Sequence, residues 1–227
     1  ATVTSTATDN SGLINHHWCR VNGGAWQDSR TSTCSIQVDI ATHGSSISFQ
    51  HYAQDYVGNT SAAQTYAFTL DHTPPVMSAA VEQNGMPDGV WDNLSNTPAY
   101  TWTATDDLSG VHGFYIYFGP DPNGTVATIY ETTGFVAGSA WSPGAVTDGQ
   151  YYLRVRAEDW AGNQTAWVTM HQYWVDSTLP VLSAAIEQNG MPDGAWSNIS
   201  ANPTYTWDAA DNSSGVRGFY IYFGTDP

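Results

Sequence analysis

Apolar and polar residues alternate along several short stretches of this chain, which is the pattern of β-strands that bury one face. Three stretches show it most clearly, at 100–104, 114–118 and 151–159. In the last of them, Leu153 and Val155 are predicted to face a core, because every second residue there is apolar and those between are tyrosine or charged. No segment has a convincing helical period. The pattern therefore predicts an all-β fold.

The chain also contains an internal repeat. Residues 71–122 align without gaps with residues 176–227, and 36 of the 52 positions are identical. The turn at 55–59, Asp-Tyr-Val-Gly-Asn, likewise matches Asp-Trp-Ala-Gly-Asn at 159–163. Such similarity at a fixed period indicates that one structural unit occurs several times.

Matching positions then define the domains. Asp9 corresponds to Asp106 and Pro227 to Pro122. We expect a partial repeat that lacks its first strand, a complete repeat, and a partial repeat that lacks its second half, at residues 1–70, 71–175 and 176–227. Neither end of the chain falls at an expected domain boundary. Three explanations stay open: a fragment, a stretch of a longer tandem array, or partial repeats that complete each other between neighbouring chains by strand addition.

Turn-forming residues separate the predicted strands of the complete repeat, at 84–85, 87–89, 109–110, 148–149 and 162–163. Roughly seven short strands in about 105 residues have the size of an immunoglobulin-like β-sandwich. Each repeat is long enough to bury a core of its own. We therefore expect tandem sandwiches arranged as beads on a string, and not a solenoid.

Two motifs give a resemblance to a known family. The stretch 152–163, Tyr-Leu-Arg-Val-Arg-Ala-Glu-Asp-Trp-Ala-Gly-Asn, is followed at 175–180 by Val-Asp-Ser-Thr-Leu-Pro. These two stretches resemble, respectively, the closing turn and the Asp-x-Thr-x-Pro linker of bacterial immunoglobulin-like repeats in large secreted and cell-surface proteins. The resemblance implies the same fold and an extracellular or bacterial cell-surface location. The resemblance also implies that the linker residues are Thr73, Pro74, Pro75 and Pro180. Proline restricts the motion of such a linker.

The only cysteines, Cys19 and Cys34, lie in the first repeat. In a chain of secreted character, two cysteines 15 residues apart favour one disulfide. The turn at 22–24, Asn-Gly-Gly, suits a hairpin between them. The alternative is a pair of free, buried thiols.

Carboxylates are expected to gather where repeats join, because the linker and two loops share one end of such a sandwich. The aspartates concerned are Asp71, Asp106, Asp107 and Asp159 for the complete repeat, Asp176 and Asp211 for the last repeat, and Asp88 and Asp148 at the opposite end. Oxygen ligands of this kind suit Ca²⁺. The alternative is that each aspartate bonds only to its own turn. We expect no other cofactor.

The amino-acid composition excludes some classes of function. The chain has five Arg, no Lys and 21 Asp and Glu, so its net charge of −16 excludes nucleic-acid binding. No apolar run approaches the roughly 20 residues of a membrane span. Six Asn-x-Ser/Thr sequons are candidate glycosylation sites: Asn59, Asn93, Asn123, Asn163, Asn198 and Asn212.

No catalytic motif is visible, and the histidines do not recur between repeats, so we do not expect an enzyme. Our first hypothesis is a structural segment of an extracellular fibre, stalk or filament whose partners are neighbouring repeats and other copies of the chain. The alternative is an adhesin or carbohydrate-binding accessory module that contacts a glycan or host protein. The two differ in whether aromatic residues such as Trp91, Trp160 and Trp196 are exposed for binding or packed.

Overall fold

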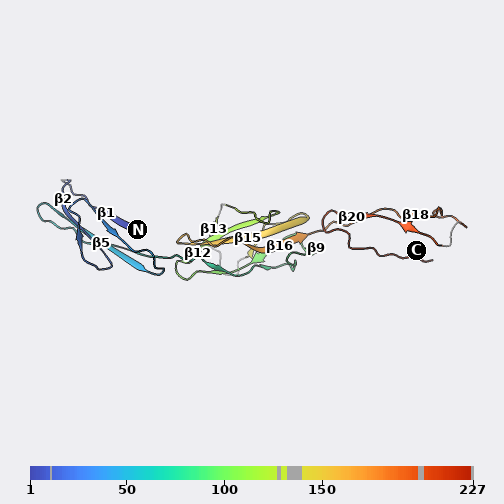
Figure 1. Ribbon diagram of the computed structural model, residues 1–227, viewed down its shortest axis with the longest axis horizontal. Helices are drawn as coiled ribbons and strands as arrows, with labels where there is room; N and C mark the ends of the chain where they lie inside the picture. Colours follow the sequence, from blue (N-terminus) through green and yellow to red (C-terminus); the bar gives the residue numbers. More distant parts are fainter. Residues whose placement is uncertain (11, 127–128, 132–139, 199–201, 226–227) are drawn as a thin grey trace. The chain divides into compact units, whose positions relative to one another are not determined.

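The computed structural model describes residues 1–10, 12–126, 129–131, 140–198 and 202–225. All regular structure in these ranges is β-strand, which confirms the predicted fold class (Figure 1). None of the described residues forms a helix long and apolar enough to span a membrane. The contacts divide the chain into two units. The first holds Ala1–Val76, Thr105–His112 and Glu158–Thr165, and the second holds Met77–Ala104, Gly113–Ala157 and Ala166–Pro227.

The first repeat contributes two sheets to the first unit. Its strands are β1 (Thr2–Thr6), β2 (Ile14–Val21), β3 (Gln27–Asp28), β4 (Thr33–Gln37), β5 (Ser46–Asp55) and β6 (Gln64–Thr69). One sheet is antiparallel with the order β3-β2-β5-β6, and the other pairs β1 with β4.

The disulfide between Cys19 and Cys34 joins these two sheets, because Cys19 lies on β2 and Cys34 on β4. The predicted pairing is therefore present. The hairpin between the cysteines pairs β2 with β3, however, so the bond crosses the core and does not link neighbouring strands. Both cysteines pack with Phe49 at the centre of the first repeat.

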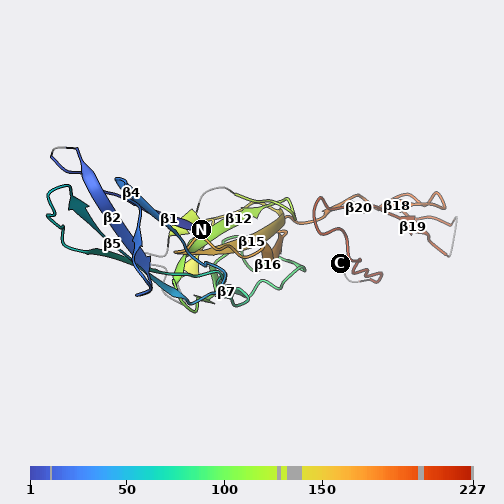
Figure 2. The ribbon, with the colours of Figure 1, turned by 60° about the vertical axis from the view of Figure 1, so that its left-hand side comes forward.

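The complete repeat has ten described strands: β7 (Val76–Met77), β8 (Val81–Glu82), β9 (Trp91–Asp92), β10 (Tyr100–Thr101), β11 (Ala104–Thr105), β12 (Val111–Gly119), β13 (Ile129–Glu131), β14 (Ala140–Trp141), β15 (Gly149–Asp159) and β16 (Val168–Val175). The main sheet has the order β13-β12-β15-β16-β9, and Figure 2 shows β12, β15 and β16 side by side. The repeat also contains a three-stranded sheet with the order β14-β10-β8 and a two-stranded sheet formed by β11 and β7.

The core of this repeat follows the alternation seen in the sequence. Leu153 and Val155 of β15 are fully buried, as are Tyr100 and Trp102. The stretch 100–104 is not one strand, as the sequence pattern indicated, because it divides into β10 and β11. Between them the main-chain N–H of Thr103 donates to the hydroxyl of Ser78 at 2.9 Å, in place of a regular ladder bond.

The last repeat has four described strands: β17 (Val181–Leu182), β18 (Ile186–Glu187), β19 (Tyr205–Thr206) and β20 (Ala209–Ala210). They form two antiparallel pairs, β17-β20 and β18-β19. These pairs correspond to β7-β11 and β8-β10 of the complete repeat, as the sequence identity requires.

Candidate functional site

Three aspartates converge at the start of the complete repeat, within the first unit. Asp71 lies in the linker, Asp106 in the loop after β11 and Asp159 at the end of β15, and one carboxylate oxygen of each lies within 4.8 Å of the others. We call these three residues the carboxylate cluster. Asp71 and Asp159 are only 8% and 1% exposed. Little water therefore screens the interaction between these neighbouring carboxylates.

Asp71 fastens the linker to the repeat that follows it. Its Oδ1 accepts the N–H of Thr73 at 3.1 Å, and its Oδ2 accepts the N–H of Ser109 at 2.9 Å. The hydrogen bonds donated by Ser109 and Thr73 lower the pKa of Asp71 from 3.8 to about 2. The carboxylate is therefore ionised at every physiological pH. We call this arrangement, linker aspartate to loop serine, the linker clasp.

The other two members differ in how well their oxygens are satisfied. Both oxygens of Asp159 accept bonds from Asn163, at 2.8 Å from its N–H and 2.7 Å from Nδ2. Asp106 accepts the N–H groups of Leu108 and Gly110 with Oδ1 alone. Its Oδ2 is buried and has no hydrogen-bond partner. A buried carboxylate oxygen without a hydrogen-bond partner is costly, and a bound cation would satisfy it.

His43 and Asp107 extend the site on its exposed side. Nε2 of His43 lies 3.2 Å from Oδ2 of Asp107, and its Nδ1 lies 3.4 Å from Oδ1 of Asp71. The hydroxyl of Thr73 donates to Asp107 at 2.7 Å, and this bond, followed by the one from His43, lowers the pKa of Asp107. The sequence carried no signal for His43, because it lies in a loop before β5 that has no motif.

The remaining aspartates behave differently. Asp176 repeats the linker clasp in the second unit, since its Oδ2 accepts the N–H of Ser214 at 2.8 Å. Asp148 binds the N–H of Ser177, Asp211 binds the N–H of Gly215, and Asp88 binds the N–H of Gln172 on β16. In the described ranges, these four aspartates form no group of three whose oxygens converge as in the carboxylate cluster.

The sequons lie at turns, in two classes. The side-chain amides of Asn59 and Asn163 donate to the aspartates that open their turns, Asp55 and Asp159. The other four asparagines are exposed: Asn93, Asn123, Asn198 and Asn212. Residue 200, which completes the sequon of Asn198, lies outside the described residues.

Several aromatic rings of the two complete sheets stack on neighbouring side chains. In the first repeat Trp18 stacks between His16 and Tyr52, with ring centroids 4.9 and 4.8 Å away. In the complete repeat the guanidinium of Arg156 lies 4.3 Å from the ring centroid of Tyr115. Each of these rings therefore has a flat side that a neighbouring side chain covers.

The tryptophans singled out from the sequence have different surroundings. Trp91 of β9 packs against Trp174 of β16, with centroids 5.9 Å apart, inside the complete repeat. Its counterpart Trp196 is fully exposed. Trp160, in the turn after β15, is 59% exposed.

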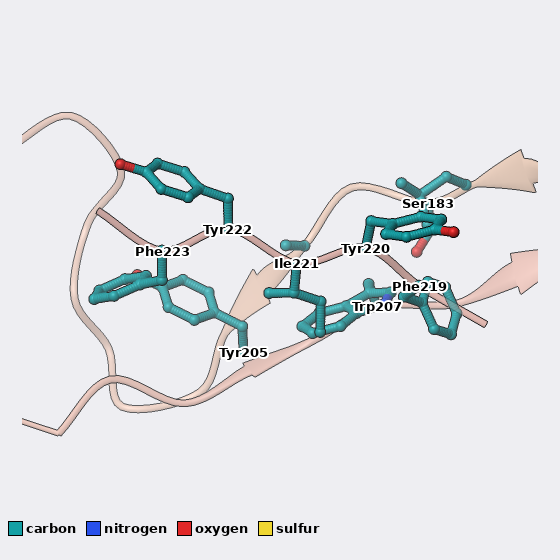
Figure 3. A pocket seen from close by; sticks show the side chains of 10 residues that line it. Ser183, Tyr205, Trp207, Phe219, Tyr220, Ile221, Tyr222 and Phe223 are labelled. Atoms are coloured by element: carbon teal, nitrogen blue, oxygen red, sulfur yellow. The ribbon is translucent and has the colours of Figure 1, made fainter. Parts of the chain in front are cut away.

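An apolar groove lies in the last repeat, where Phe219, Ile221 and Phe223 face Tyr205 and Trp207 (Figure 3). The same sequence, Phe-Tyr-Ile-Tyr-Phe, occurs at 114–118 in β12. There Ile116 is 5% exposed, as part of the core of the complete repeat, whereas Ile221 is 68% exposed. The groove is thus the inner face of a sandwich, and we do not interpret it as a ligand pocket.

No protein-family model matches the chain. It is similar to Chitinase A1 of Niallia circulans, with 31% identity over 164 residues, covering 70% of this chain and 21% of that protein. It is also similar to Exoglucanase B of Cellulomonas fimi, with 29% identity over 182 residues, covering 76% of this chain and 15% of that protein. The chain therefore spans about a fifth or less of the length of these relatives.

Two solved structures are also similar. One is dimeric latent PorU from Porphyromonas gingivalis, with 13% identity, a TM-score of 0.32, and coverage of 82% of this chain and 22% of that chain. The other is the FN1–FN3 segment of chicken CNTN1, with 14% identity, a TM-score of 0.29, and coverage of 82% and 66%. The chain consists of immunoglobulin-like β-domains, as its own strand order and cores indicate.

Proposed function

We propose that this chain is a non-catalytic, extracellular accessory segment of a secreted bacterial protein, in which tandem sandwiches space other domains. The observation that carries this proposal is the linker clasp, which occurs at Asp71 and again at Asp176. In both places a linker aspartate binds the loop of the repeat that it leads into. A linker held in this way is suited to transmitting position between domains.

The relatives support an accessory role over a filament. The chain matches about a fifth or less of a chitinase and an exoglucanase. Those names describe enzymes, and repeats of this fold are compatible with many functions. The parent protein that we propose is therefore a multidomain protein acting on a polysaccharide, with catalysis located outside these repeats.

Two assays test the accessory role. Incubation of the purified chain with chitin and with a soluble glucan should release no reducing ends, and turnover would contradict the proposal. The variant Asp176→Ala should make the linker at 176–180 more sensitive to a protease. The matched control is Asp193→Ala, because Asp193 is exposed and lies outside the linker. Equal cleavage of both variants would show that the clasp does not fix the linker.

We further propose that the carboxylate cluster binds Ca²⁺. Three negative charges converge there, two of the side chains are buried, and the buried Oδ2 of Asp106 has no protein partner. Hard carboxylate oxygens are ligands that Ca²⁺ prefers, and water and main-chain carbonyls supply the rest of its coordination in proteins. The alternative, aspartates that serve only their turns, leaves that oxygen unexplained.

The variant Asp106→Asn separates the two interpretations. Asparagine retains the Oδ1 acceptor for Leu108 and Gly110 but removes the negative charge. If Ca²⁺ binds, calcium should raise the melting temperature of the native chain by several degrees relative to chelator, and the variant should lose that response. The control Asp211→Asn alters the matching aspartate of the last repeat and should leave the response intact. A native chain that melts identically with calcium and chelator would refute the site.

A further inference from the structure

The turn after β15 holds an aromatic side chain that the domain does not need for its core. Trp160 is 59% exposed, and Tyr56, at the same turn of the first repeat, is 66% exposed. Large apolar side chains at turn tips gain little from folding. The hydrophobic core therefore does not explain why an aromatic residue occupies this place in both repeats.

The indole of Trp160 is nevertheless held in place. Its main-chain N–H donates to the carbonyl of Gly110 at 3.1 Å. The ring of His112 packs against the indole, with centroids 4.3 Å apart and planes at 45°. Support from the protein side and exposure on the other leave an ordered aromatic surface facing solvent, which reduces the entropy lost when a ligand binds.

The histidine that packs on this indole belongs to a polar, hydrogen-bonded set of side chains. Nδ1 of His112 lies 3.2 Å from Oε1 of Glu158, and Nε2 of Gln164 donates to Oε2 of the same carboxylate. The first repeat lacks this set, because Ile14, Gln54 and Thr60 stand at the corresponding positions. Among the residues that the structure describes, the turn of the complete repeat thus combines an exposed ring with a hydrogen-bonded histidine, carboxylate and amide, and the turn of the first repeat does not.

We propose that Trp160, with Glu158, Gln164 and His112, forms a binding subsite for a pyranose ring of a neutral polysaccharide. The C–H face of a pyranose stacks on an indole, while carboxylate and amide groups at its edge bond to hydroxyls. The net charge of −16 and the carboxylate of Glu158 disfavour sulfated or uronic-acid glycans. Neutral glucans and chitin fit both conditions.

This inference rests on the proposed function, since it specifies what an accessory segment of a polysaccharide-degrading protein would contact. The test is co-sedimentation of the intact chain with insoluble chitin and with cellulose. The native chain should be retained by at least one of them. Trp160→Ala should weaken retention roughly tenfold, since one stacked ring contributes about that much, and Trp160→Phe should retain part of it.

The control is Tyr56→Ala, which removes an equally exposed ring from the turn without the polar set and should leave binding unchanged. Unchanged melting temperatures would show that both variants are folded. Failure of the native chain to bind either polysaccharide, or equal binding by Trp160→Ala, would overturn the subsite. If the exposed ring instead causes association between copies, sedimentation without polysaccharide will detect it, and that result also contradicts the proposal. None of these outcomes affects the reducing-end assay for the accessory role.

Discussion

Single residues in this protein have defined electrostatic and steric roles. His51 is the residue through which we expect pH to affect the stability of the first repeat. It lies on β5 with its Nδ1 3.1 Å from Nε2 of the buried His17, and its ring stacks near Phe49 and Tyr66. Burial, followed by repulsion from His17, lowers the pKa of His51 below its ordinary value of 6.5. The folded state therefore takes up the proton less readily than the unfolded chain.

It follows that the first repeat should lose stability as the pH falls below about 6.5 and through the lowered pKa of His51. Above pH 6.5 both states are neutral at this residue and the contribution is complete. Urea unfolding between pH 7.5 and 5 measures the effect. His51→Gln should flatten the dependence, and a variant with the native slope would show that another group is responsible.

Gly124 illustrates a steric role. A Cβ atom built on it would lie 2.0 Å from Cζ of Tyr117, so the tyrosine ring occupies the space that any other side chain needs. We expect Gly124→Ala to lower the free energy of unfolding of the complete repeat by about 1–3 kcal/mol. Chemical denaturation measures this, and the double variant with Tyr117→Ala should show a smaller loss than the sum of the single variants. Strict additivity would mean that the contact is unimportant.

At the scale of elements, the same strand sequence occurs in two environments. Ile116 of β12 is buried in the core of the complete repeat, whereas Ile221 lines the open groove. Ile116→Ala should cost about 2–5 kcal/mol, and Ile221→Ala should change stability by less than about 0.5 kcal/mol. Urea unfolding of the two variants compares them directly. Equal losses would mean that the groove is covered in solution.

The disulfide gives a second prediction at this scale, because it joins the β1-β4 sheet to the sheet that contains β2. Replacing Cys19 and Cys34 by alanine should remove about 3 kcal/mol from the first repeat, as expected for a loop of 15 residues. Calorimetry should show one transition moving to lower temperature while that of the complete repeat stays in place. A shift of both transitions would show that the repeats unfold together.

The sequence allowed prediction of those elements whose pattern is local. The alternation of Leu153 and Val155 with arginines placed β15 and its buried face, because strand geometry fixes which side chains share a face. The division of 100–104 into β10 and β11 was not predictable, since it depends on the hydroxyl of Ser78, distant in sequence. The linker aspartates were identifiable from their repetition. His43 was not, because its position depends on tertiary structure alone.

At the scale of the whole molecule, the chain consists of immunoglobulin-like β-domains and is strongly acidic. The net charge of −16 raises the local concentration of cations around the chain. Only the junction between the first and the complete repeat, among the described residues, gathers three carboxylates with an unsatisfied buried oxygen. We therefore expect one tight cation site at this junction and many weak, screened contacts elsewhere.

Isothermal titration of the intact chain with Ca²⁺, in 150 mM salt to suppress weak surface binding, tests this claim most directly. We predict a single saturating site that Asp106→Asn abolishes and Asp211→Asn leaves unchanged. Absence of a saturating site, or a site that survives Asp106→Asn, would contradict the assignment of the carboxylate cluster as the cation-binding junction.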